Sequence, residues 1–258
     1  CYPLGSILTI AAAGSEMSNS CVITNEEGWY KKALDTDLAR PKFAIMNPEI
    51  TYTLPDYQTQ CGCADIMMHT MERYFVLEDT MEITDKIAQD VMKYAKILKK
   101  DPENYEARAE IMWCGSLSHN GLTGCGTCGG DWATHLMEHE LGGMFDVAHG
   151  AGLAAVWGSW ARYVMDEKPE RFAQFAVDVM GVEESDDVKS TALKGIEAVE
   201  EFYRMIEMPT NMKELGINPT DKQIKDMAMK ATNHDTQQLG AFKKLSAKDL
   251  VEIYKTAK

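Results

Sequence analysis

A change of residue pattern near position 57 constrains the fold of this chain more than any other feature. After that point, apolar residues recur every three or four positions almost to the C-terminal end, which is the spacing of amphipathic α-helices. Before it, short apolar runs separated by turn residues predict β-strands over 7–12, 21–24 and 43–46. The pattern predicts a short α/β segment followed by a helical unit.

The helical part divides at capping residues, glycines and prolines. Nine helices are predicted, over 61–75, 84–99, 101–117, 132–144, 150–164, 169–180, 188–205, 221–231 and 247–256. The third of them is expected to start with Asp101 as the N-cap, because Pro102 follows in the position where helices favour proline.

The charge balance excludes two classes of partner. Acidic residues outnumber basic residues 40 to 26, which gives a formal net charge of −14. A surface this acidic repels phosphate backbones and anionic lipid heads, so neither nucleic acid nor a membrane surface is an expected partner. The apolar stretch 151–157 is far too short to span a bilayer. The start lacks the basic region and cleavage site of a signal peptide, so a cytoplasmic location is expected.

Seven cysteines, an odd number without a secretory signal, favour reduced thiols. Cys61 and Cys63 together with Cys125 and Cys128 could form a four-thiolate zinc or iron–sulfur site. The two pairs lie about 60 residues apart, which is wider than the spacing of compact zinc sites. The favoured interpretation is that these thiols pack as small apolar side chains.

Five polar residues have the spacing of a metal site. Asp65 and His69 are one helical turn apart, as are His135 and His139, and His149 follows in the turn after Gly142-Gly143. Taken singly, each pair is equally consistent with a surface pair or a helix cap. Together, among apolar neighbours where an unpaired charge is costly, they predict one divalent cation held by a carboxylate and imidazoles. No His-Glu-x-x-His string occurs, which argues against metal-assisted peptide hydrolysis.

Five motifs in register extend this pattern. They are Gly14-Ser15-Glu16-Met17-Ser18, Ile50-Thr51-Tyr52-Thr53-Leu54-Pro55, Ala64-Asp65-x3-His69, Gly130-Asp131-Trp132-Ala133-Thr134-His135-x3-His139-Glu140-Leu141 and His149-Gly150. With them the chain resembles the iron-containing (group III) alcohol dehydrogenases, specifically the branch of butanol dehydrogenases and NAD(P)H-dependent aldehyde reductases. The resemblance covers essentially the whole chain.

The resemblance implies an α-rich α/β fold of dehydroquinate synthase-like architecture. Residues 1–57 would be the C-terminal part of a dinucleotide-binding α/β domain, and residues 58–258 an all-helical metal-binding catalytic domain, with the active site in the cleft between them. The implied reaction is reversible hydride transfer between NAD or NADP and a primary alcohol such as butanol. The implied assembly is a homodimer.

The resemblance also assigns roles to single residues. Asp65, His69, His135 and His149 match the metal ligands, which suit Fe2+ and Zn2+ equally. His139 matches a catalytic histidine near the nicotinamide and the substrate, where an imidazole can move a proton. Cofactor-lining positions are matched by Thr9, Ser15 and Lys31, and by Leu54 in a segment beside the cofactor. Glu138 and Asp146 are candidates either for orienting imidazoles or for solvated surface carboxylates.

Two departures from the family pattern affect these expectations. The glycine-rich diphosphate loop is absent and is expected upstream of Cys1, and Ala13 stands where the family usually has threonine. The alternative to a dehydrogenase is therefore a noncatalytic helical metal-binding domain, or an inactive fragment, in which the ligands only stabilise the fold.

Overall fold

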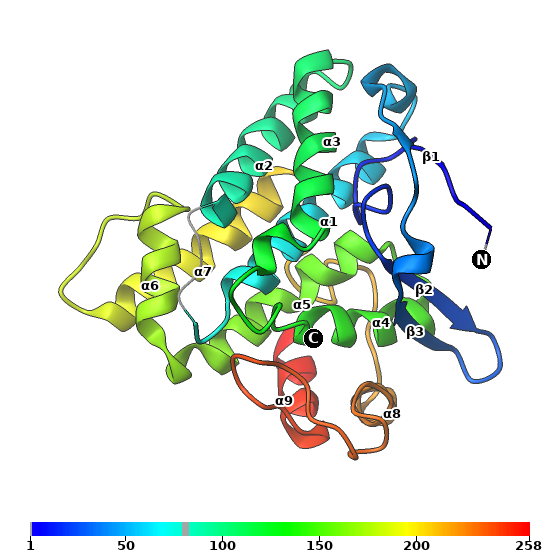
Figure 1. Ribbon diagram of the computed structural model, residues 1–258. Helices are drawn as coiled ribbons and strands as arrows, with labels where there is room; N and C mark the ends of the chain where they lie inside the picture. The colour runs from blue at the N-terminus through cyan, green and yellow to red at the C-terminus, as the bar shows by residue number, and fades with distance from the viewer. Residues whose placement is uncertain (1, 79–82) are drawn as a thin grey trace.

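The computed structural model describes residues 2–78 and 83–258 of the chain. Helices dominate these residues (Figure 1). The α-helices are α1 (Asp56–Tyr74), α2 (Ile83–Lys100), α3 (Tyr105–His119), α4 (Ala133–Phe145), α5 (His149–Val164), α6 (Pro169–Asp178), α7 (Val188–Met205), α8 (Asp221–Ala231) and α9 (Ala247–Ala257). Short 3-10 helices are η1 (Asp37–Ala39), η2 (Pro48–Thr51), η3 (Leu122–Gly124) and η4 (Met165–Glu167).

The N-terminal segment forms two small sheets. Strand β1 (Ser6–Ile7) runs parallel to β4 (Ala44–Ile45), and β2 (Ser20–Asn25) pairs with β3 (Tyr30–Asp35) as an antiparallel hairpin. The strand predicted over 7–12 is wrong for most of its length. The amide of Leu8 still donates to the carbonyl of Ile45, but the backbone bends at Thr9 and leaves the sheet. Strand β3, which pairs with β2, was not predicted.

Helix α1 forms the centre of the helical part. Every residue from Thr59 to Tyr74 is buried, because α2, α3 and α5 pack around the helix. Buried positions on α1 include polar ones, among them Asp65, His69 and Glu72. Buried polar groups are costly without partners, so the residues that surround α1 have to satisfy these side chains.

Glycines let α5 and the N-terminal segment approach α1 closely. A Cβ atom at Gly150 would lie 2.0 Å from the carbonyl oxygen of Cys61, and one at Gly62 would lie 2.1 Å from the carbonyl oxygen of Ala11. Only a residue without a side chain fits at such distances. The first turn of α5 is therefore held against the middle of α1.

Two predicted details of the helices need correction. Helix α3 is capped by Asn104, whose side chain accepts from the amide of Ala107, and not by Asp101. The residues from Asp101 to Asn104 form a turn that follows α2, since the amide of Asn104 donates to the Asp101 carbonyl. His149 is the first residue of α5 and does not lie in a turn.

Among the described helices, none combines the length and the apolar composition that crossing a membrane requires.

Candidate metal centre

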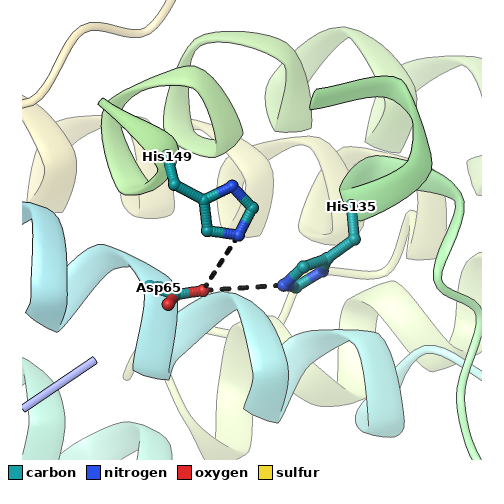
Figure 2. A group of neighbouring side chains, drawn as sticks. All are labelled: Asp65, His135 and His149. Carbon is teal, nitrogen blue, oxygen red and sulfur yellow. Dashed lines mark ion pairs between the residues drawn. The ribbon is translucent and has the colours of Figure 1, made fainter. Parts of the chain in front are cut away.

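Three predicted ligands from three helices meet at one point (Figure 2). Asp65 lies on α1, His135 on α4 and His149 at the start of α5. The Nε2 atoms of His135 and His149 lie 3.5 and 3.6 Å from Oδ1 of Asp65, and the three ligand atoms are all within 4.8 Å of one another. Within residues 2–78 and 83–258, this is the one group of three potential metal-binding side chains.

The fourth predicted ligand, His69, lies against this group. Its Nδ1 atom is 3.5 Å from the same Asp65 oxygen, and its ring stacks on that of His135 with centroids 4.5 Å apart. The structure thus brings the carboxylate and two imidazoles together and places the third imidazole one helical turn further along α1.

The donor atoms of this cluster fit a divalent cation. Oδ1 of Asp65, Nδ1 of His69 and Nε2 of His135 are buried and make no hydrogen bond. Buried polar atoms in proteins almost always have a partner, and unpaired ones require an explanation. A carboxylate oxygen that faces imidazole nitrogens is a donor set that Fe2+ and Zn2+ accept.

Two buried carboxylates hold the far sides of the imidazoles. Glu72 accepts hydrogen bonds from the backbone amide and from Nδ1 of His135, at 3.0 and 3.1 Å. Glu138 accepts one from Nδ1 of His149. In each histidine, Nε2 is then directed at Asp65. Carboxylates that bond the other nitrogen of a metal-binding histidine in this way fix the orientation of its ring.

Sequence reasoning left Glu138 undecided and missed Glu72. Glu138 is fully buried, whereas Asp146, the other candidate, is exposed at the C-terminal cap of α4. The signal for Glu72 was its position seven residues after Asp65, which places both side chains on one face of α1.

The cluster shifts the proton affinities of its members. Burial opposes ionisation of Asp65, but the imidazoles of His69 and His149 outweigh it and hold the pKa of Asp65 below its ordinary value. Burial also opposes the charged form of His135, yet the nearby carboxylates of Asp65 and Glu72 raise its pKa to about 9. For His69, burial prevails and the pKa falls well below the ordinary value.

A further histidine, His119, was not predicted to belong here. Its ring lies 4.1 Å from that of His69, and its Nδ1 faces a guanidinium nitrogen of Arg73 at 3.1 Å. Gly14 packs directly beside it, since a Cβ atom there would lie 3.1 Å from Cβ of His119. The turn that starts the 14–18 motif is therefore next to the cluster.

The other predicted site residues lie at several places around the cluster. His139 is buried one turn after His135, its ring centroid is 5.9 Å from that of His149, and burial lowers its pKa to about 3. Lys31, on β3, contacts Glu138 at 3.1 Å. Thr9 and Ser15 are exposed in the N-terminal segment, and Leu54 is half-buried in a small pocket that Arg108 also lines.

The four-thiolate alternative does not agree with the structure. Cys61 and Cys63 are buried on α1, where burial raises their pKa values to about 11 and 12. Cys125 and Cys128 are exposed in the loop that precedes α4. Within the part of the chain that the structure describes, no group of three potential ligands includes a cysteine.

Asp131 positions the helix that carries His135. Its carboxylate is buried and accepts hydrogen bonds from the amides of Ala133, Ala241 and Phe242, at 3.0, 2.7 and 2.7 Å. Asp131→Ala leaves these amides without an acceptor, so we expect the free energy of unfolding to fall by about 3 kcal/mol. Chemical denaturation measures the change. Asp226→Ala, on an exposed part of α8, is the control and should change it by less than about 0.5 kcal/mol.

Comparisons with known proteins agree on one family. The sequence profile described as "Fe-containing alcohol dehydrogenase family, C-terminal" matches residues 59–258. The NADH-dependent butanol dehydrogenase A of Clostridium acetobutylicum is 36% identical over 258 residues, which are 98% of this chain and 66% of that protein. The NADPH-dependent aldehyde reductase YqhD of Escherichia coli is 32% identical over 261 residues, 99% of this chain and 66% of the reductase.

A solved structure extends the likeness to three dimensions. The crystal structure of NADH-dependent butanol dehydrogenase A from Thermotoga maritima superposes with a TM-score of 0.92 at 34% identity. The match covers 99% of this chain and 66% of that one. The chain thus spans slightly less than two thirds of the length of the relatives it matches.

Proposed function

Because this chain belongs to the Fe-containing alcohol dehydrogenase family, we propose that the protein is a metal-dependent alcohol dehydrogenase and aldehyde reductase. The proposed reaction is reversible hydride transfer between NAD or NADP and a primary alcohol such as butanol. Relatives named as butanol dehydrogenases and as an aldehyde reductase support this substrate class. The observation that carries the proposal is the group of Asp65, His135 and His149, whose potential ligand atoms lie within 4.8 Å of one another. In this group, Oδ1 of Asp65 and Nε2 of His135 are buried and have no hydrogen-bond partner.

In this proposal, Asp65, His69, His135 and His149 hold Fe2+ or Zn2+. When bound, the ion supplies Lewis-acid chemistry that lowers the pKa of an alcohol and polarises an aldehyde carbonyl. The residues of the chain fix the ligands, since Glu72 and Glu138 hold the imidazoles of His135 and His149.

Residues 1–57 are proposed to belong to the domain that binds the cofactor, and residues 58–258 are proposed to form the domain that binds the metal. Thr9, Ser15, Lys31 and Leu54 belong to the cofactor side in this division. A cytoplasmic homodimer is also part of the proposal, and light scattering after size-exclusion chromatography tests the assembly.

His139 is proposed to move the proton between the substrate oxygen and solvent. Its Nδ1 atom is buried without a hydrogen-bond partner, and the ring lies near His149. We expect His139→Ala to retain one metal per chain and to lower kcat about 100-fold, because general acid–base groups contribute factors of this size. Metal analysis and steady-state kinetics measure both quantities. Loss of the metal in this variant would instead make His139 a ligand.

The proposed function is tested on the intact protein with butyraldehyde and NADH or NADPH. A chelator should abolish oxidation of the reduced cofactor, and Fe2+ or Zn2+ should restore it. Fluorescence titration with NADH in the presence of each metal distinguishes the alternative. A protein that binds stoichiometric metal but neither NADH nor NADPH would be the noncatalytic metal-binding domain.

A further inference from the structure

Glu138 makes two contacts with one oxygen atom. Oε2 accepts a hydrogen bond from Nδ1 of His149, at the start of α5, and one from Nζ of Lys31, on β3, at 3.1 Å. The side chain of Glu138 is 0% exposed and that of Lys31 is 18% exposed. One buried carboxylate thus connects the β2–β3 hairpin to a residue of the metal cluster, although Lys31 and Glu138 are 107 positions apart.

Two glycines make the space that this carboxylate occupies. A Cβ atom at Gly142 would lie 2.9 Å from Oε1 of Glu138 and 2.9 Å from Nζ of Lys31. A Cβ atom at Gly152, on α5, would lie 2.8 Å from Cγ of Glu138. The helices α4 and α5 therefore enclose the Glu138 side chain closely, which restricts it to the conformation that meets both donors.

We propose that Glu138 is a positioning residue that orients the imidazole of His149 for metal binding and at the same time holds Lys31 of the hairpin. The proposal rests on the proposed function, because it takes His149 as a metal ligand. It assigns Lys31 a second role, since its ammonium group acts on the metal site through Glu138.

The charges explain why both donors are needed. A buried carboxylate with a single neutral partner would be strongly destabilised. The ammonium group of Lys31 and Nδ1 of His149 both contact the buried Oε2 atom, so the carboxylate has one charged partner besides the imidazole. An ionised Glu138 is a strong acceptor for the Nδ1 proton of His149, which leaves Nε2 free to face Asp65.

The first test is the affinity of the intact protein for Zn2+, measured by competition with a chelating dye. Glu138→Gln keeps the shape but loses the charge, and we expect Zn2+ to bind 10- to 100-fold more weakly, the usual cost of losing such a partner. Glu140→Gln is the matched control, because Glu140 is also buried on α4 but its charged neighbours are Lys32 and Lys230. It should change the affinity less than about twofold.

A double-mutant cycle tests the role of Lys31. Lys31→Met should change the Zn2+ affinity about threefold or more in the wild-type background and less than about twofold in the Glu138→Gln background, since contacting residues couple. Equal effects in both backgrounds would show that Lys31 acts independently of Glu138, and this part of the proposal would be wrong.

A third measurement needs no substitution at Glu138 and therefore does not depend on the folding of a variant. Nitrogen-15 NMR of His149 in the Zn2+-loaded protein should show a protonated, hydrogen-bonded Nδ1 and a metal-bound Nε2. Metal bound through Nδ1 would overturn the proposal, as would equal Zn2+ affinities of Glu138→Gln and the wild type. Butanol oxidation is assayed separately, so an inactive protein with the expected affinity gap counts against the proposed function alone.

Discussion

Asp65→Ala is expected to remove the metal from the protein and to abolish its turnover. Asp65 supplies the one carboxylate of the cluster, and its Oδ1 atom lies within 3.6 Å of nitrogen atoms of His69, His135 and His149. Without it, three neutral imidazoles face a dication in a buried site with no ligand to balance the charge. We expect metal content below about one tenth of the wild-type value and activity lowered at least about 1000-fold.

His149→Ala should have the same effect on metal and turnover, with the helical circular dichroism retained in both variants. Cys63→Ala is the control on α1, because Cys63 is as buried as Asp65, while the ionisable groups that act on its thiol are Arg108, Cys114, Asp56 and Cys61. It should keep the metal. Stoichiometric metal with wild-type turnover in Asp65→Ala would show that the ligand assignment is wrong, and metal loss in Cys63→Ala would favour a thiolate site.

The helical part of the fold was predictable because its signals are local. The predicted bounds of α7 and α8 are those observed. Both helices have an apolar face of helical period and begin after a capping side chain, Asp187 for α7 and Thr220 for α8. The start of α3 was wrong since Asp101 and Asn104 both resemble caps, and only the hydrogen bond to Ala107 distinguishes them.

The N-terminal segment was less predictable, because pairing in a sheet depends on distant residues. An apolar run resembled a strand through residue 12, yet β1 ends where its partner β4 ends, at Ile45. Strand β3, which was not predicted, has two adjacent lysines followed by two adjacent apolar residues, so it lacks the alternation that predicts a strand. Its side chains find their partners on α4 and α8, where Lys31 contacts Glu138 and Lys230 contacts the ring of Tyr30.

The same limit applies to the candidate metal centre. Spacing and family resemblance together predicted Asp65, His135 and His149, which the structure brings to one point. Glu72 and His119 were missed, because their roles depend on how α1, α3 and α4 pack. A helical pattern states which residues share a face, but it does not state which face of another helix they meet.

Gly150→Ala is expected to disturb the fold and the metal site together. In an exposed helix, this change would stabilise the protein by about 1 kcal/mol through helix propensity. Here the new Cβ atom would lie 2.0 Å from the carbonyl oxygen and 2.7 Å from the carbonyl carbon of Cys61. Backbone atoms of α1 cannot yield as a side chain can, so the overlap outweighs propensity and we expect a loss of about 3 kcal/mol in the free energy of unfolding.

The overlap also reaches the metal site, because Gly150 directly follows His149 in the first turn of α5. If α5 moves away from α1, Nε2 of His149 moves away from Asp65, so weaker Zn2+ binding should accompany the lower stability. Gly115→Ala on α3 is the matched control, since the nearest atom to its new Cβ is the flexible end of Ile66, at 3.3 Å, and the nearest backbone atom, the carbonyl oxygen of Ala12, is at an ordinary contact distance of 3.6 Å. It should change the stability by less than about 1 kcal/mol and leave Zn2+ binding unaltered. Chemical denaturation measures the free energy of unfolding of both variants, and titration measures their Zn2+ affinity. A Gly150→Ala protein as stable as the Gly115→Ala protein would contradict the close packing of α5 on α1.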